Sequence, residues 1–375
     1  MKKLVLLLTL FVVACDLTGG GSTAVSPVIG STTLSLSLST LALSVTGLTE
    51  YGVSGTPSSG VARTITVTNT GSNSASNLVI DYPSWPSGTT ASSDCGSTLA
   101  AAATCTITIT PGATASSDGS NPCSDGTTPN AGVLSIGSDN ASTVTANVYI
   151  LSYGCVYQGG YVYAFDDTPN SSETVAGKVL AVSDQAAPYP SGIIWSSDGS
   201  GPDSGDIVYD SIYGISETST TSSANPNSGV VSGQTACNGA IDGSCNTNNI
   251  YTYYENNAPS APINLNYYAA GLCKQTISGY SDWYLPAACE LGFDATSTGT
   301  GCGSSGTPTT QNAQSSLVDF NSLNLLSGYY HSSTESSGSP ASFVISQYFT
   351  NGGGSVQNTS LKNNLLGVRC SRLFF

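Results

Sequence analysis

The sequence predicts a mainly β protein with few and short helices. Gly, Ser, Thr and Asn dominate, whereas helix formers such as Lys, Glu, Arg and Met are scarce, and charged residues make up only 8% of the chain. Many short segments alternate apolar with polar residues and are separated by turn-forming residues. Of 11 cysteines, ten remain once Cys15 is set aside, an even number that favours a disulfide framework in an exported chain.

Residues 1–15 are predicted to be an export signal that is removed from the mature protein. Two lysines precede the apolar run 4–14, which is shorter than the about 20 residues of a membrane-spanning helix. The run ends in Val12-Val13-Ala14-Cys15, which resembles the lipobox of bacterial lipoproteins. The resemblance implies cleavage before Cys15 and acylation of its thiol and amino group, and several acyl chains make a firm anchor in membrane lipid.

This signal places the mature chain in the cell envelope, with the outer membrane or the cell surface favoured. Asp16 follows the modified cysteine and leaves the periplasmic face of the inner membrane open, since an acidic residue here retains some lipoproteins. Residues 16–33 are mostly small and polar and are expected to form a flexible tether.

The chain is strongly acidic. Its formal net charge is -15, and without Lys2 and Lys3 it becomes -17, from 6 basic and 23 acidic side chains. Such a surface repels polyanions, so nucleic acid is excluded as a partner. The 20 tyrosines suit wet binding surfaces, although the preferred interpretation is that most of them line the core and rim of a β-rich fold.

Residues 34–155 are predicted to form a β-sandwich. Leu34, Leu36 and Leu38 alternate with serines, and the alternation resumes one residue out of step at Leu41, which suits a bulge or a break between two strands. Further strands are expected at 64–68, 78–80, 104–110, 133–136 and 144–151.

Two segments of this region, TITVTNTG from Thr64 and CTITITP from Cys105, resemble the Ig-like repeats of bacterial surface proteins. The resemblance implies a spacer, and the alternative is that the sandwich itself binds a ligand. Cys95 and Cys105 flank an Ala-rich hairpin loop and are expected to pair, which leaves Cys123 and Cys155 to pair within the same domain.

Residues 156–375 are predicted to mix strands with a few short helices. Strands are expected at 157–165, 342–349 and 366–370, strands or a strand-like entry at 175–185 and 192–195, and mostly loop at 196–235. Helices are expected at 266–275, at 285–291 and at 315–326.

Three segments in this region carry a second resemblance: GYSDWYLP at 279–286, GYYHSST at 328–334 and GVRCSR at 367–372. Their order and spacing resemble the family named for the C-terminal domain of the bacterial collagen-like adhesin Lcl, which is similar in fold to C-type lectins and to formylglycine-generating enzymes. The resemblance implies an α+β, C-type-lectin-like domain with a mostly antiparallel sheet. The residues that carry the motif are Trp283, Leu285, Pro286, Tyr330, His331 and Arg369.

The motif residues also have direct physical interpretations. Trp283 is expected to anchor the core, and Pro286 suits the first turn of a helix whose N-terminus Glu290 complements. Arg369 is expected to pair with a partly buried carboxylate such as Asp282 or Glu290, with a ligand contact as the alternative.

The C-type-lectin arrangement implies a disulfide bond between Cys273 and Cys370. Cys237 with Cys245, and Cys289 with Cys302, would then be local links. These pairs are expectations, since many connectivities are open to ten cysteines.

The chain departs from the family at Tyr284, where an arginine is common, and at His331, where a tryptophan is usual. The adhesin's domain recognises sulfated polysaccharides, but residues 156–375 carry five Lys or Arg against sixteen Asp or Glu, a formal charge of -11 that repels sulfates. The predicted function is therefore adhesin-like binding of a glycan or a host or matrix protein through the C-terminal domain. The alternative is a structural envelope lipoprotein that acts in protein–protein assembly without a soluble ligand.

We expect no enzyme and no cofactor. His331 is the only histidine, and no carboxylate is placed behind it as a Ser-His-Asp arrangement would require. No metal is expected either. Asp198, Asp203 and Asp206 offer oxygen ligands for calcium at short spacing, but that spacing does not fit an EF-hand, and a solvated loop is the preferred interpretation.

Overall fold

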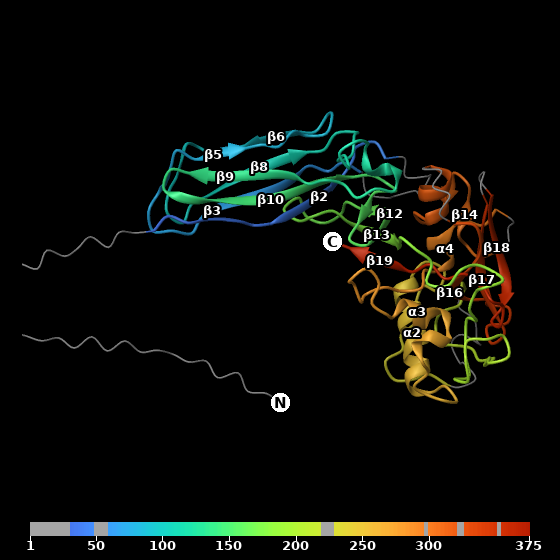
Figure 1. Cartoon of the computed structure of the whole chain (residues 1–375). Helices are drawn as coiled ribbons and strands as arrows, with labels where there is room; N and C mark the ends of the chain where they lie inside the picture. The colour runs from blue at the N-terminus through green and yellow to red at the C-terminus, as the bar shows by residue number, and fades with distance from the viewer. Residues whose placement is uncertain (1–30, 49–58, 219–228, 296–298, 321–325, 351–353) are drawn as a thin grey trace, which may run out of the picture.

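The computed structural model describes residues 31–48, 59–218, 229–295, 299–320, 326–350 and 354–375. Within them the chain is mainly β with few short helices (Figure 1), which confirms the coarse fold class. The predicted signal, Cys15 and most of the tether lie outside the described residues. Within the described ranges, none of the helices has the length and apolar character needed to cross a bilayer.

We call the described residues up to 155 the N-terminal half and those from 156 onward the C-terminal half. The N-terminal half contains two four-stranded sheets that share one apolar core, as the alternating sequence predicts. Every second residue of the regular strands is buried, for example Ile65 and Val67 in one sheet and Leu134 and Ile136 in the other. The first sheet has the order β1 (Leu34–Leu36), β3 (Arg63–Asn69), β8 (Thr104–Thr110), β6 (Thr90–Ser93). The second has the order β2 (Thr40–Ser44), β10 (Ala141–Leu151), β9 (Gly132–Ser138), β5 (Val79–Asp81), and β4 (Ala75–Ser76) pairs with β7 (Thr98–Leu99).

The shift in alternation after Leu38 is a break between two strands. β1 pairs with β3 in the first sheet, whereas β2 pairs with β10 in the second. The chain thus crosses from one sheet to the other at this point. The β2–β10 pairing is parallel, with Leu41 opposite Val148, although the other pairings in the two sheets are antiparallel.

The C-terminal half contains two larger sheets. One has the order β11 (Val156–Tyr157), β12 (Gly160–Asp166), β13 (Ala176–Ala181), β19 (Ser371–Phe374), and the other β16 (Gly328–Glu335), β17 (Phe343–Thr350), β18 (Gly354–Leu361). A hairpin joins β14 (Gly303–Ser304) to β15 (Thr307–Pro308). All named strand pairs in this half are antiparallel.

The longest helix of the described residues, α2 (Gly243–Asn256), was not predicted. Its sequence is rich in Asn, Thr and Tyr, which are indifferent helix formers. Asp242 caps its first turn by accepting a hydrogen bond from the Cys245 N–H at 2.9 Å, and Ile250 and Tyr254 are buried beneath it. Tertiary packing therefore stabilises a helix that local propensity does not favour.

The three predicted helices are present but shorter. Residues 266–275 form a 3-10 turn, η2 (Leu265–Tyr267), and α3 (Ala269–Cys273), separated by the extended backbone of Tyr268. Residues 285–291 give only α4 (Ala288–Leu291), so Pro286 precedes the helix instead of occupying its first turn. Residues 315–326 give a π-helical turn, η3 (Gln314–Asp319), and the stretch 321–325 lies outside the described residues.

The predicted strand at 366–370 is wrong, and 192–195 is not a regular strand. Residues 192–195 and 366–370 make single bridges, Ile193 with Leu366 and Val368 with Ala186, and the regular strand β19 begins only at Ser371. Strand β18 was not predicted, because its sequence GSVQNTSL is mostly polar.

The ten described cysteines form five disulfide bonds, so the disulfide-bonded character is confirmed. The pairs coincide with the expected ones: Cys95–Cys105, Cys123–Cys155, Cys237–Cys245, Cys273–Cys370 and Cys289–Cys302. Two pairs lie in the N-terminal half and three in the C-terminal half. None of these five disulfide bonds therefore links one half to the other.

A buried ion pair joins the two halves instead. Arg63 Nη2 lies 2.7 Å from Asp167 Oδ1, and both side chains are almost completely buried. Ser44 donates a hydrogen bond to the other carboxylate oxygen of Asp167, and Arg63 also donates to the carbonyls of Asn170 and Glu173. The segment after β12 is thus held against the edge of the N-terminal sheets, where Figure 1 shows the two halves meeting.

Candidate functional site

The six residues that the sequence resemblance singles out lie inside the C-terminal half. Trp283, Leu285, Pro286, Tyr330, His331 and Arg369 are all buried. The Trp283 indole N–H donates a hydrogen bond to the Ile277 carbonyl at 2.9 Å, and the Tyr330 ring meets Phe349 edge to face. These side chains therefore build the scaffold and do not present a surface to a ligand.

His331 is completely buried on strand β16. Its Nε2 faces the carbonyl oxygens of Ile193 at 2.9 Å and Asn364 at 3.2 Å, whereas Nδ1 has no hydrogen-bond partner among the described residues. Burial lowers the pKa of His331 to about 4, against 6.5 for a free imidazole. Two carbonyl acceptors on one nitrogen fit a neutral ring with its proton on Nε2, which is a packing role.

Replacing His331 by glutamine is expected to remove one acid-sensitive contribution to stability. The unfolded chain binds a proton at this position below pH 6.5 and the folded chain only below about pH 4, so acidification through this window favours unfolding. The stability advantage of the wild type over His331→Gln should shrink by roughly 3 kcal/mol between these limits. Urea unfolding of both proteins across the pH range measures this difference, and parallel curves would contradict it.

Glu335 does not disturb this comparison. Burial raises the pKa of Glu335 to about 7, which acts on stability in the opposite direction within the same window. Because Glu335 is present in both proteins, its contribution cancels in the difference.

Arg369 pairs with a partly buried carboxylate, but this carboxylate is neither Asp282 nor Glu290. Its Nε donates to Asp184 Oδ1 at 2.7 Å, because Asp184 follows β13 and lies beside the end of the chain that carries Arg369. Asp282 pairs instead with Arg372 at 2.5 Å, and Glu290 pairs with Lys178 at 2.5 Å. Opposite charges are therefore matched as expected, but with different partners.

The buried Glu290 carboxylate accepts hydrogen bonds from three other residues besides its ion pair with Lys178. It accepts hydrogen bonds from the Ala287 and Gly243 backbone N–H groups, at 2.8 and 3.2 Å, and from the Tyr284 hydroxyl at 3.0 Å. It thereby complements the N-terminus of α4, as predicted, and also reaches the start of α2. Tyr284 is buried, and its hydroxyl serves this internal network.

A second buried ion pair joins Glu335 to Lys362. The two groups lie 2.5 Å apart, and both side chains are completely buried. Lys362 also donates to the Asp210 carbonyl at 2.6 Å and lies 4.4 Å from the centre of the Trp195 ring, while Glu335 accepts from the Ile212 N–H. With its donors and acceptors engaged in this way, the pair fixes the loop 195–212 to the β16–β18 sheet.

The calcium candidate is not assembled. Asp198 and Asp206 approach each other through the Ser200 hydroxyl, and the Asp198 N–H donates to the Asp206 carbonyl at 2.9 Å. Asp203 contributes its backbone N–H to Asp206. In the described part of the chain these three carboxylates do not gather within the reach of one ion. The oxygens of Asp198 and Asp206 accept hydrogen bonds from within the loop.

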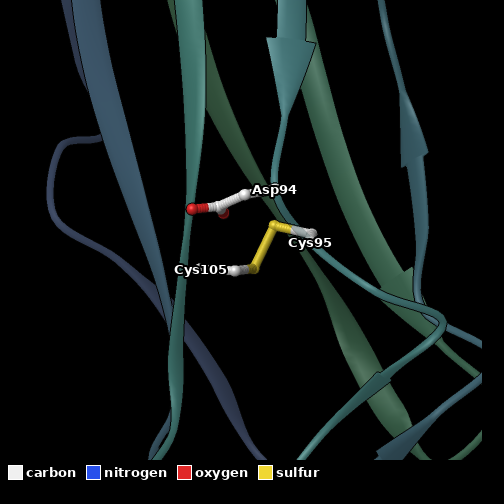
Figure 2. A group of neighbouring side chains, drawn as sticks. All are labelled: Asp94, Cys95 and Cys105. Atoms are coloured by element: carbon white, nitrogen blue, oxygen red, sulfur yellow. A yellow bond between two sulfur atoms is a disulfide. The ribbon is translucent and has the colours of Figure 1, made fainter.

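Asp94, Cys95 and Cys105 form the group of potential metal ligands found among the described residues (Figure 2). The two sulfur atoms are joined in a disulfide bond, so neither offers the thiolate that binds metals. Asp94 accepts a hydrogen bond from the Thr106 N–H at 2.6 Å. The group is therefore a covalent link beside a turn and not a metal centre.

A cleft of about 410 Å³ lies where the two halves meet, and we call it the tyrosine cleft. Its size falls within the range of about 300–1,000 Å³ that is usual for small-molecule sites. The N-terminal half contributes Tyr149 of β10, and the C-terminal half contributes Tyr157 at the β11–β12 turn and Tyr280 before Trp283. The other lining residues are Thr40, Thr128, Pro129, Val156, Gln158, Thr174 and Phe375.

The three tyrosine rings are held by their surroundings and are each only partly buried. The Tyr149 and Tyr157 rings lie 5.5 Å apart between centroids, and Tyr157 also meets Phe374 edge to face. Burial raises the pKa of Tyr157, and the neighbouring Tyr149 and Tyr280 add to this effect. Tyr157 therefore remains a neutral hydroxyl at physiological pH.

The β11–β12 turn adopts a strained conformation at the edge of the cleft. Gln158 has a φ of 44° and Gly159 of 90°, which is typical of a two-residue hairpin turn that favours Asn-Gly or Gly-Gly. Gln158 Oε1 accepts from Arg372 at 2.9 Å and its Nε2 donates to the Phe375 carbonyl at 3.3 Å. The Gln158 side chain thus links this turn to Arg372 and Phe375.

Two further hollows lie elsewhere. One of about 340 Å³ is lined by Trp85 and the loop 114–122, and one of about 360 Å³ lies beside Phe165 and Phe374. The tyrosine cleft differs from both because three tyrosines line it from two halves of the chain. The abundance of tyrosine was the only sequence signal for it, and that abundance does not say which tyrosines meet.

The architecture defines a mainly β, disulfide-bonded protein. No protein-family model and no curated protein matches the chain. Among solved structures, 42% of the chain is similar to 19% of the S-layer protein rSbsC, with 13% identity and a TM-score of 0.22. In a second comparison, 38% of the chain is similar to 29% of the secreted serine protease VesC from Vibrio cholerae, with 16% identity and a TM-score of 0.19. The chain thus spans less than a third of either protein, and likenesses this distant carry no argument.

Proposed function

We propose that this chain is an exported lipoprotein, anchored through Cys15, that binds a ligand outside the cytoplasm in the manner of an adhesin. In this proposal, residues 34–155 are an Ig-like sandwich and residues 156–375 are a C-type-lectin-like domain similar to the C-terminal domain of Lcl. The lipobox-like signal supports the anchor, and the five disulfide bonds suit an oxidising compartment.

The observation that carries the binding function is the tyrosine cleft. The motif residues of the C-terminal half are buried, so a ligand must meet other side chains. Tyr149, Tyr157 and Tyr280 supply aromatic surface and hydroxyl groups at a junction of two parts of the fold, which is a common place for a ligand site. The buried Arg63–Asp167 ion pair joins the two halves that supply these tyrosines. The N-terminal sandwich therefore has a part in binding beyond that of a spacer.

Adhesion by intact cells tests this function. Bacteria that display the full chain are compared with bacteria that display a Tyr149→Ala/Tyr280→Ala double variant, on immobilised glycans and extracellular-matrix proteins. The double variant should lose at least about tenfold in binding, since removing two aromatic anchors typically removes this much or more. Protease added to the cells should cleave the displayed chain.

A matched control is Tyr189→Ala/Tyr209→Ala, which removes two exposed tyrosines that do not line the cleft. Equal adhesion by both double variants and the wild type would contradict the proposal. If cross-linking in cells gave one dominant envelope partner in all three, the alternative of a structural assembly lipoprotein would take its place.

A further inference from the structure

The chemistry of the cleft wall narrows the class of ligand. The cleft is lined by three tyrosines, Tyr149, Tyr157 and Tyr280, and by the threonines Thr40 and Thr128. Phenol and hydroxyl groups can both donate and accept a hydrogen bond, and the Tyr157 side chain already makes one with Gln158. A ligand that is itself rich in hydroxyl groups matches such a wall, because every ligand hydroxyl needs both kinds of partner. A proline-rich peptide offers carbonyl acceptors and few donors, so it would use only half of this capacity.

The charges around the cleft favour a neutral ligand. Arg372 lies beside the cleft, with its guanidinium 3.9 Å from the centre of the Tyr280 ring, but it is engaged with Asp282 at 2.5 Å and with Gln158 at 2.9 Å. The Asp282 side chain is 51% exposed, so the nearby surface is negative. An anionic ligand would meet this carboxylate, an arginine that is already neutralised and a domain of formal charge -11.

The shape of the cleft provides flat apolar surface as well as hydrogen bonds. The Tyr149 and Tyr157 rings are tilted by 58° to each other, so the two rings do not stack face to face on each other. Gly159 allows the Tyr280 ring to approach the turn, since a Cβ there would lie only 3.1 Å from the ring. Fixed rings of this kind suit the alternating C–H and O–H faces of sugar rings.

We infer that the tyrosine cleft is a binding site for a neutral oligosaccharide, which packs its rings on the tyrosines and exchanges hydrogen bonds with the cleft hydroxyls. The inference rests on the proposed binding function and adds the ligand class. It also places the sugar at the junction of the two halves, where both halves must contact it.

Purified, oxidised full-length protein tests this directly. The probes are neutral gluco-, manno- and galacto-oligosaccharides, heparin as a sulfated glycan, and a proline-rich peptide, each measured by array and then by calorimetry. We expect binding to at least one neutral oligosaccharide, with an affinity that changes less than twofold between low and high salt, since no ion pair is formed. Tyr149→Ala and Tyr280→Ala should each weaken that binding at least tenfold.

Two further variants keep the test decisive. Tyr149→Phe retains the ring and should weaken binding by two- to tenfold through the lost hydroxyl, even if an alanine variant proves unstable. Tyr209→Ala removes an exposed tyrosine outside the cleft and should leave binding within twofold of the wild type.

The outcomes separate the ligand class from the function. Cleft-dependent binding of heparin or of the peptide, without binding of neutral sugars, would overturn the ligand class while leaving the proposed function standing. Neutral-sugar binding that the cleft variants do not change would overturn the site. If no probe binds and the displayed chain gives no adhesion of cells, both the ligand class and the proposed binding function are overturned.

Discussion

Replacing both Cys273 and Cys370 by alanine is expected to lower the free energy of unfolding by about 4–5 kcal/mol. This disulfide bond spans a sequence separation of 97 residues, and both sulfur atoms are buried. A crosslink of this length removes much of the conformational freedom of the unfolded chain, so its loss favours unfolding. Denaturant unfolding of the oxidised full chain, followed by fluorescence, measures the effect.

The matched control is Cys237→Ala/Cys245→Ala, which removes a bond with a separation of only 8 residues. The same chain-entropy argument gives a loss of about 2–3 kcal/mol for this shorter loop. Equal losses in the two double variants would show that local packing, and not loop closure, determines what these bonds contribute.

Replacing Lys362 by methionine is expected to cost about 3–5 kcal/mol of stability at pH 8. The change removes the cationic partner of the Glu335 carboxylate, which stays completely buried. Of the two donors to this carboxylate named above, Lys362 and the Ile212 N–H, only the Ile212 N–H then remains. Methionine fills a similar volume against Trp195, so the loss of charge dominates over the loss of packing.

The loss should depend on pH in a defined direction. Burial already raises the pKa of Glu335 from 4.5 to about 7, and removing the cation raises it further. A carboxyl whose pKa is higher in the folded than in the unfolded state loses stability as pH rises through that window. The variant should therefore be closer to the wild type at pH 5 than at pH 8.

Lys178→Met is the control for this prediction. Lys178 is 26% exposed, and its partner Glu290 keeps three other hydrogen-bond donors, so a smaller and less pH-dependent loss is expected. Calorimetric melting at pH 5 and pH 8 distinguishes the two variants. A Lys362→Met loss that equals that of the control at both pH values would contradict the argument.

The strands of the N-terminal half were predictable because their signal is local. Segments such as 64–68 and 104–110 place every second side chain on one face, and the observed strands β3 and β8 bury that face. The break after Leu38 was likewise visible as a change of phase. No knowledge of the other sheet was needed to see either feature.

The helices and the polar strands of the C-terminal half were less predictable. Helix α2 depends on an Asp242 cap and on burial of Ile250 and Tyr254 beneath other elements, neither of which its own composition reveals. Strand β18 is mostly polar because its inward-facing Gln357 donates hydrogen bonds to buried carbonyls of Ala288 and Gly292. Such partners lie far away in the sequence.

The sequence by itself determined that this is a mainly β chain with ten cysteines to pair and an acidic surface, because alternation, composition and charge act over a few residues or over the whole chain. Only the tertiary structure decided that Arg369 pairs with Asp184, and that Tyr149, Tyr157 and Tyr280 share one cleft. The physical reason is distance along the chain. Contacts between residues a hundred or more positions apart depend on how the sheets pack, and no local pattern encodes that packing.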